Sequence, residues 1–519
     1  MSTTTLSTRP KQRLALIRTE KVWFAALAVA CLAVTFRTAL LRPLVFHELS
    51  TLFVASTPTI RGMWQAIPTD GNPPLYFLLA RLFLKLPLKT ELALRLPAIL
   101  GYFGAALTVY IFVRRDGGRL GAWFAMCVFI GCSISFYAID ARPYPLLLLF
   151  TGLALCCWQA YCGSGSRIAL VGLTLGIAGA IFAHQYGVIY TLCPVLAGEA
   201  VRSLRQRKVD PAVVAASAIG ALTVLLTFPP MLRAQKPLLD TIRACPRFSA
   251  RPHVGDLDYY LGILPRFIPV LLIFGLVVFL MWLALAPKRE ELPPADEIPP
   301  EDWAAAVATA LLLPVILIVT RSGTDYYQPR YGIGSGMGIA MLCGMMLSRL
   351  RWRHAPPLAW VLSAYCVAVG LLGIWLAAKP PGVAPWADPL LHAGNANEPI
   401  VVANATEFSP MWWYSDASMR RRLHYLADLT YTARQGGLVP EYSLMLERAY
   451  LPMRLDDYQT WLAGRQHFLL YCSGDSGLEW MKQRLAAGGW RLTLLQSGPA
   501  GKASGAKAAS QREMFEVSR

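Results

Sequence analysis

Charged residues are scarce in this chain of 519 residues. Only 15% of them are Asp, Glu, Lys or Arg, whereas hydrophobic residues make up 55%. Soluble globular proteins carry about 25% charged residues. The composition therefore excludes an ordinary soluble globular protein and predicts a membrane protein.

Negative charge is the scarcer sign, with 31 acidic against 49 basic residues and a net charge of +18. A strongly basic chain can bind nucleic acid, but many of these Lys and Arg residues lie in short linkers between apolar segments. Such clusters orient membrane helices, with the basic linkers in the cytoplasm. We therefore interpret the charge as a topology signal and expect no nucleic-acid partner.

Motifs for metals and nucleotides are also lacking. The 11 cysteines form no CxxC pair and no Cys/His ligand spacing, and most lie in or beside apolar segments, where cysteine packs as a small hydrophobe. The glycine run at 332–338 lies inside an apolar segment with no strand before it, which favours helix packing over phosphate binding. We therefore expect no bound cofactor, while the sequence leaves open whether a divalent metal is required.

Long hydrophobic runs are abundant instead. A membrane helix needs about 20 apolar residues, and 11 segments approach that length. We expect spans at residues 22–41, 93–113, 120–138, 142–161, 167–184, 186–201, 211–230, 264–286, 303–320, 330–348 and 357–378. This pattern predicts a multi-spanning α-helical membrane protein with about 11 transmembrane helices.

The linkers between these spans predict the domains and their sides. The basic N-terminus, residues 1–21, is expected in the cytoplasm. The transmembrane domain is expected at 22–378 with outside loops at 42–92 and 231–263, followed by a periplasmic or extracytoplasmic domain at 379–519. Segment 73–86 is interpreted as an amphipathic helix on the outer interface, because Arg81 and Lys85 share one helical face. The expected location is the cytoplasmic (inner) membrane.

The composition of the C-terminal residues, 379–519, differs from that of the rest of the chain. Short apolar runs bounded by turn residues predict strands at 399–403, 423–427, 467–472, 491–496 and 514–517. Residues 478–487 are expected to form a helix that ends at Gly488-Gly489. We therefore predict a soluble α/β domain, in which 498–512 is a flexible loop.

Five polar clusters fall on the predicted outer side. Ionisable groups at membrane edges are costly unless they are paired or used. Each cluster alone could be an interfacial anchor, but their common side favours one site. The clusters are His47-Glu48; Asp140, Arg142 and Tyr144; His184 and Tyr186; the basic loop with Arg243 and Arg247; and Asp325, Arg330 and Tyr331.

Short motifs connect these clusters to a known family. They are His47-Glu48-Leu-Ser-Thr, Asn72-Pro-Pro-Leu-Tyr76, Leu94-Arg-Leu-Pro97, Asp140-Ala-Arg-Pro-Tyr144, His184-Gln-Tyr186 and Arg330-Tyr331. In order and spacing over residues 20–345 they resemble the GT-C superfamily of membrane glycosyltransferases, which includes protein O-mannosyltransferases and lipid A aminoarabinose transferases. The resemblance implies a GT-C-like fold and transfer of a sugar, with inversion, from a polyprenyl-phosphate-sugar donor to a hydroxyl of a lipid, glycan or protein acceptor.

The resemblance also implies roles for individual residues. Glu48 and His47 would be catalytic, although the family usually has an acid where His47 stands, so that either residue could be the base or activity could be lost. Asp140 stands where Glu is common. The donor phosphate and the substrate would be bound by Arg142, Tyr144, Asp140, His184, Tyr186, Arg330, Tyr331, Arg243 and Arg247.

Two alternatives remain beside this hypothesis. A lipid-linked sugar transporter or flippase would also need many helices and groups that bind lipid phosphate, but the chain has no internal repeat of the kind that many transporters show. A catalytically silent relative is the other alternative, because His47 departs from the family pattern.

Overall fold

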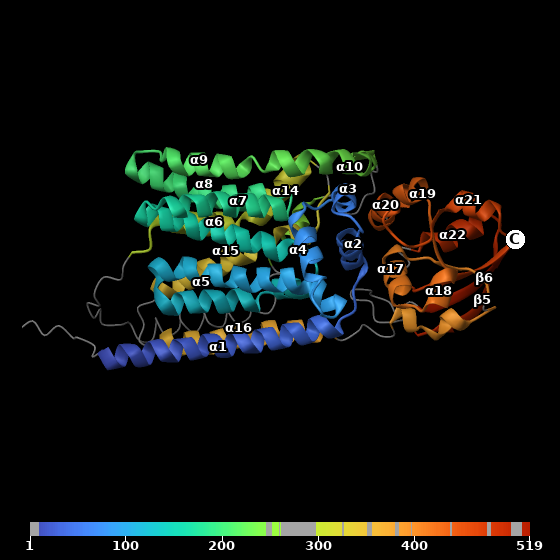
Figure 1. Ribbon diagram of the computed structural model, residues 1–519, viewed down its shortest axis with the longest axis horizontal. Helices are drawn as coiled ribbons and strands as arrows, with labels where there is room; N and C mark the ends of the chain where they lie inside the picture. Colours follow the sequence, from blue (N-terminus) through green and yellow to red (C-terminus); the bar gives the residue numbers. More distant parts are fainter. Residues whose placement is uncertain are drawn as a thin grey trace, which may run out of the picture.

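The computed structural model describes the chain at residues 10–244, 252–258, 260, 297–323, 326–349, 355–378, 384–395, 397–435, 438–474, 479–499 and 511–519. The long helices lie side by side along the longest axis of the molecule, with an α/β tail at one end (Figure 1). Predicted span 264–286 and residues Arg247 and Asp325 lie outside the described residues.

The helices of the membrane part follow the apolar segments. They are α1 (Pro10–Leu41), α5 (Thr90–Gly131), α6 (Tyr144–Ser164), α7 (Arg167–Ala183), α8 (Gly187–Gln206), α9 (Pro211–Ala221), α10 (Val224–Ala244), α13 (Pro300–Ala310), α14 (Leu312–Ser322), α15 (Gly334–Arg349) and α16 (Ala355–Leu376). Two short 3-10 turns, η1 (Ser133–Ile139) and η3 (Pro329–Gly332), join some of them.

A multi-spanning helical membrane protein is confirmed, but the predicted count is not. By length and composition, six helices in the described part can cross a membrane, or seven if the bent pair α13–α14 forms one span. The span expected at 93–113 lies in α5 and the one expected at 120–138 covers the end of α5 and most of η1; Gly118 breaks α5 between them with a φ of 71°. Helix α7 has only 17 residues, fewer than the about 20 that a membrane helix needs.

Close helix packing explains the glycine run at 332–338. A Cβ atom at Gly338 would overlap the backbone of Ala310 on α13, and one at Gly334 would lie 2.5 Å from the ring of Tyr190 on α8. Small residues let helix backbones approach this closely. The sequence interpretation of these glycines is confirmed.

Three short helices lie between the membrane helices and the tail (Figure 1). They are α2 (Phe46–Ala55), α3 (Ile60–Asp70) and α4 (Leu75–Phe83). Helix α4 has nine residues and is too short to cross a membrane. Arg81 on α4 donates to the carbonyl oxygens of Ala55 and Thr57 at 2.9 and 2.6 Å. This arginine therefore ties α4 to the end of α2.

Residues 231–244, expected to belong to an outside loop, are helical and extend α10.

The tail contains a six-stranded sheet in the order β3-β2-β1-β4-β6-β5. Its strands are β1 (Ile400–Val402), β2 (Leu423–Ala427), β3 (Leu455–Asp457), β4 (His467–Cys472), β5 (Arg491–Gly498) and β6 (Arg512–Ser518). Strands β3, β2, β1 and β4 are parallel, and β6 and β5 are antiparallel. The five strands and the helix expected in this region are present, the helix as α22 (Trp480–Ala487), and β3 is the strand that the sequence did not predict.

The tail shares a hydrophobic core with the short helices. Leu49 and Phe53 of α2 belong to the same buried cluster as Phe408 and Met411 of α17 (Ala405–Tyr414). Phe53 also makes an edge-to-face contact with Trp413 at 5.8 Å between ring centroids. Burying a side chain such as Phe stabilises a fold by about 1.5–3 kcal/mol. The tail is thus packed firmly against α2, next to the polar motifs.

Candidate active site

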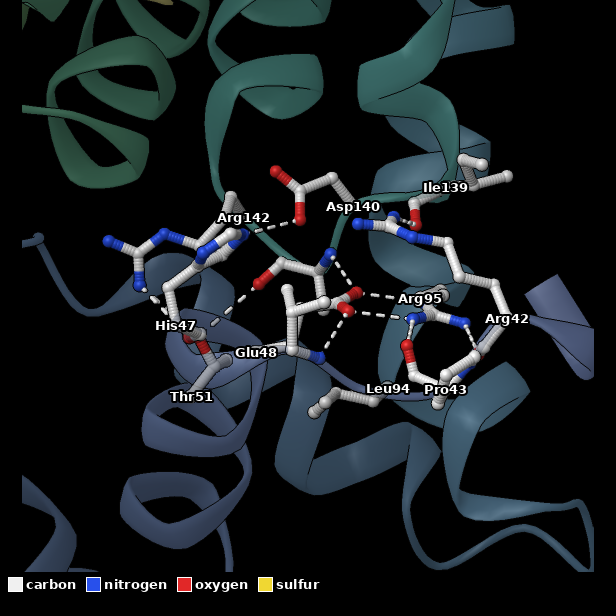
Figure 2. A network of polar contacts seen from close by, with 12 residues as sticks. Arg42, Pro43, His47, Glu48, Thr51, Leu94, Arg95, Ile139, Asp140 and Arg142 are labelled. Carbon is white, nitrogen blue, oxygen red and sulfur yellow. Dashed lines mark hydrogen bonds and ion pairs between the residues drawn. The ribbon is translucent and has the colours of Figure 1, made fainter. Parts of the chain in front are cut away.

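Glu48 is fully buried at the first turn of α2 (Figure 2). Its two carboxylate oxygens accept from Nε and Nη2 of Arg95 at 2.7 and 2.6 Å, and from the backbone N–H groups of Ala141 and Val45 at 2.9 and 3.1 Å. Burial alone would raise the pKa of Glu48, but Arg95 outweighs it and holds that pKa below its ordinary value. The carboxylate is therefore ionised and occupied by four donors.

Arg95 extends this network to the preceding loop. Its guanidinium also donates to the carbonyl oxygens of Ala39, Arg42 and Pro43 at 2.8, 2.6 and 3.0 Å (Figure 2). The pair thus fixes the chain between α1 and α2 against residue 141. Because Glu48 does not line the cavity described below, its position favours holding the site together over contacting a substrate.

His47 lies on the other side of the same turn and is paired with Asp140. Nε2 of the imidazole lies 2.8 Å from Oδ1 of Asp140, and the side chain is 31% exposed (Figure 2). Burial alone would raise the pKa of Asp140, but His47 outweighs it and, with Arg42 and Arg142, holds the pKa well below its ordinary value. An ionised Asp140 accepts from Nε2–H, which leaves Nδ1 of His47 as a proton acceptor.

Arg142 lies close by and forms an ion pair that the sequence did not predict. Its Nη1 lies 3.0 Å from Oδ2 of Asp70, the last residue of α3. Asn72 donates to the other oxygen of Asp70 at 2.5 Å. Arg142 also contacts the His47 carbonyl and the Thr51 hydroxyl, both at 3.4 Å. The ion pair therefore ties the segment after η1 to the end of α3.

Arg330 is a second arginine at this site and has no acidic partner among the described residues. Its Nε–H is buried without a hydrogen-bond partner, and its guanidinium lies 5.9 Å from the ring of Tyr144. The charges of Arg142 and Arg330 are close enough to repel each other. A cation with a buried N–H group that lacks a partner is costly, so this half-buried arginine favours an anionic ligand at this end of the site.

Aromatic rings surround the two arginines. The imidazole of His184 packs against Tyr144, Tyr186 and Tyr331 with ring centroids 5.1, 5.6 and 5.9 Å away. His184 accepts from the backbone N–H of Tyr186 through Nδ1 at 3.2 Å, which leaves Nε2–H as a donor. Tyr190 donates to the Tyr331 carbonyl at 2.6 Å and holds η3 in place.

One cavity of about 600 Å³ joins these groups. Its polar wall includes His47, Arg142, Tyr144, His184, Tyr186, Arg330 and Tyr331, together with Ser50, Asp70 and Glu447. Its apolar wall comes mainly from α10, with Val224, Phe228, Met231, Leu232, Leu238, Leu239 and Ile242. The cavity therefore combines a cationic, aromatic end with a long hydrophobic side.

The structure separates the predicted site residues into three groups. Seven of them line the cavity, while Glu48 and Asp140 lie behind it and hold it in shape. Arg243, near the end of α10, does not line the cavity and donates to the carbonyl of Gly323, which follows α14. Arg247 lies outside the described residues. Within the described part, no three His, Cys, Asp or Glu side chains come together in a way that could hold a metal ion.

Ser50, Asp70 and Glu447 are among the cavity residues that the sequence did not predict. Ser50 and Asp70 stood within or beside motifs that carried the family resemblance, so proximity to those motifs was an available signal. Glu447 comes from α20 (Leu438–Glu447) of the tail and had no such signal.

The fold resembles that of two solved structures of ArnT, which agrees with the fold that the resemblance predicted. The solved structure of ArnT from Cupriavidus metallidurans in the apo state matches with a TM-score of 0.54 at 14% identity, over 96% of this chain and 98% of that chain. A structure of the same protein bound to undecaprenyl phosphate matches with a TM-score of 0.52 at 14% identity, over 95% and 98%. No protein-family model and no curated protein sequence matches the chain.

Proposed function

We propose that this protein is a glycosyltransferase of the cytoplasmic membrane that moves a sugar from a polyprenyl-phosphate donor to an acceptor hydroxyl on the outer face. The observation that carries the proposal is Arg330, a cation without an acidic partner among the described residues, in a cavity that has an apolar wall. The likeness to an ArnT structure bound to undecaprenyl phosphate supports the same ligand class.

A polyprenyl-phosphate sugar fits the polar and the apolar walls of the cavity. Arginine binds phosphate through two parallel hydrogen bonds, and Arg330, with Arg142 beside it, supplies such donors. The prenyl chain would lie along the apolar side of α10, between Val224 and Ile242. The sugar would lie between them, against the rings of Tyr144 and Tyr331.

We assign the base to His47 and a positioning role to Glu48. All four strong contacts of Glu48 are to donors inside the protein, so it has little capacity to take a further proton. His47 lines the cavity, and Asp140 orients its imidazole with Nδ1 as the acceptor. An orienting carboxylate of this kind fixes the tautomer of a catalytic histidine.

The reaction would proceed by direct displacement. The acceptor oxygen attacks the anomeric carbon while Nδ1 of His47 takes the hydroxyl proton. The bond from that carbon to the phosphate oxygen breaks, and its electron pair leaves on the phosphate. That leaving group is a weak base, so it needs the charge of Arg330 and Arg142 rather than a proton. A single displacement inverts the anomeric centre.

Binding of undecaprenyl phosphate to the detergent-solubilised protein tests the donor site directly. We expect the phosphate to bind and undecaprenol, which lacks the phosphate, to bind much more weakly. Arg330→Ala should weaken phosphate binding by about 10- to 150-fold, since a hydrogen bond to a charged group contributes about 1.5–3 kcal/mol. The matched control is Arg233→Ala, because Arg233 lies exposed on α10 and does not line the cavity.

Three outcomes would count against the proposal. Equal affinity for undecaprenyl phosphate and undecaprenol would show that no phosphate site exists. Equal loss of affinity in Arg330→Ala and Arg233→Ala would show a non-specific charge effect. Phosphate binding accompanied by lipid transport across vesicles, without sugar transfer, would favour the flippase alternative.

A further inference from the structure

Ser50 lies between two carboxyl groups at the tail side of the cavity. Its Oγ lies 2.8 Å from Oδ2 of Asp70 and 2.6 Å from Oε1 of Glu447. Both distances are those of hydrogen bonds between oxygen atoms. A serine hydroxyl has one proton and can donate to one of these oxygens only. One of the two carboxyl groups must therefore carry the second proton.

The surroundings assign that proton to Glu447. Burial alone would raise the pKa of Asp70, but Arg142 outweighs it and, with Asn72 and Ser50, holds the pKa below its ordinary value. Glu447 forms no ion pair with a base in the described part of the chain. Burial, together with the charge of Asp70, raises the pKa of the Glu447 carboxyl to about 8. At neutral pH, Glu447 is thus the acid and Asp70 the carboxylate.

Other titratable groups lie on the elements packed against α20. Glu441, on α20 itself, accepts from the Tyr425 hydroxyl and the Trp480 indole N–H and belongs to the tail interior. The groups that act on Glu447 through charge are Asp70 and Arg142. The neighbouring helices α3, α17 and α19 (Leu429–Gln435) also carry Arg61, Glu407, Tyr431 and Arg434.

We propose that Glu447 is a protonated positioning residue through which the tail completes the active site. Its carboxylic acid donates to Ser50, Ser50 donates to Asp70, and Asp70 holds Arg142 in the cavity wall. The tail helix α20 thereby becomes part of the arginine's support. This inference rests on the proposed function only for the role given to Arg142.

Loss of the Glu447 proton would break this series of hydrogen bonds. The ionised Glu447 would accept the Ser50 proton and repel Asp70 across a few ångströms of buried space, because like charges raise each other's free energy there. Asp70 would then lose its contact with Ser50, and Arg142 would lose part of its support. Transfer should therefore fall as pH rises through about pH 8 and level off at a lower rate above it.

Infrared spectroscopy tests the proton without relying on transfer. A carboxylic acid has a C=O band that a carboxylate lacks. The difference spectrum between the wild-type protein and Glu447→Gln should contain this band at about pH 7 and lose it by about pH 9.5. A difference spectrum without the band at neutral pH would overturn the proposal. The wild-type titration keeps the test valid even if a variant folds poorly.

Thermal stability gives a second readout with a definite sign. Folding raises the pKa of the Glu447 carboxyl. The contribution of Glu447 to the stability of the folded protein is therefore full below about pH 4.3 and is lost as pH rises to about pH 8. The wild type should therefore lose melting temperature across this window more steeply than Glu447→Gln. Identical slopes in the two proteins would contradict the assignment.

Transfer itself separates this inference from the proposed function. Glu447→Gln should flatten the alkaline fall in kcat, because the amide can still donate to Ser50, while the matched control Glu441→Gln should keep that fall. An alkaline fall that persists in Glu447→Gln would overturn the positioning role and leave the glycosyltransferase proposal intact. A wild type with the infrared band but no transfer would contradict the proposed function alone.

Discussion

Nε2 of His47 lies 2.8 Å from Oδ1 of Asp140, and this contact orients the imidazole at the edge of the cavity. The neighbouring residue, Glu48, points the other way into a buried pair with Arg95. Two adjacent side chains in one turn of α2 thus have different surroundings. The first faces a space where a substrate can lie, and the second fixes the backbone that presents it.

Removing the His47 imidazole should slow the chemical step. We expect His47→Ala to lower kcat by about 10²–10⁴-fold, the usual contribution of a positioned general base. Donor affinity should stay close to that of the wild type, because the phosphate is held by the arginines. Steady-state kinetics together with donor binding would separate the two effects. A change in affinity with kcat unaltered would contradict the role of His47.

Asp140→Asn should slow the same chemical step by changing the tautomer of His47. The amide of Asn can donate to Nε2, which would move the imidazole proton to Nδ1 and remove the proposed proton acceptor. We expect kcat to fall while the melting temperature changes less than in Glu48→Gln. Wild-type turnover by Asp140→Asn would show that this contact does not orient the base.

Glu48→Gln should act on stability first. Breaking a buried ion pair costs about 3–5 kcal/mol because it leaves an uncompensated charge, here that of Arg95. We expect a large fall in melting temperature and in folded yield. The double variant Glu48→Gln, Arg95→Met should recover part of the loss. A stable Glu48→Gln protein with no turnover would instead return Glu48 to a catalytic role.

Arg330→Lys should show whether the planar guanidinium matters at the donor site. A lysine keeps the charge but cannot form two parallel hydrogen bonds to phosphate. We expect affinity for undecaprenyl phosphate between those of the wild type and Arg330→Ala. Calorimetry or native mass spectrometry can measure the order of the three proteins. Equal affinity of Arg330→Lys and the wild type would leave charge alone as the basis of binding.

Gly338→Ala should destabilise the contact between α15 and α13. The added Cβ would overlap the backbone of Ala310, and rigid backbone cannot move aside cheaply. We expect a loss of about 1–3 kcal/mol, typical of overpacking. Gly464→Ala is the matched control, since a Cβ there meets no atom within 4 Å. Comparable melting temperatures for the two variants would contradict the packing contact.

Local sequence patterns predicted much of the fold. Runs of apolar residues located helices such as α6 and α16, and short apolar stretches in the tail located β2 and β4. They also separated two spans at residues 114–119, where Gly118 breaks α5. They could not count the crossings, because an apolar run does not reveal where a helix such as α7, with 17 residues, begins and ends. The helical part of 231–263 was missed because its prolines and charges resembled those of a loop.

The sequence could predict which candidate residues lie on the same side of the membrane, because each crossing of the membrane reverses the direction of the chain. Counting crossings brought His47, Arg142, Tyr144, His184 and Arg330 to one end, and these residues do line one cavity. Counting could not distinguish a buried side chain from an exposed one, so Glu48 and His47 both remained candidates for the base. Glu447 lies 397 positions from Ser50, and their contact depends on how the tail docks.

The central claim is sugar transfer from a polyprenyl phosphate, with Arg330 binding the donor and His47 taking the proton. The most direct measurement is single-turnover transfer by the purified protein from a panel of synthetic undecaprenyl-phosphate sugars, with donor binding measured in parallel. We predict that the wild type releases undecaprenyl phosphate and forms an inverted glycoside, that His47→Ala binds the donor but transfers the sugar about 10²–10⁴-fold more slowly, and that Arg330→Ala binds the donor about 10- to 150-fold more weakly. Donor binding without release of undecaprenyl phosphate in the wild type, or full transfer by both variants, would contradict the account.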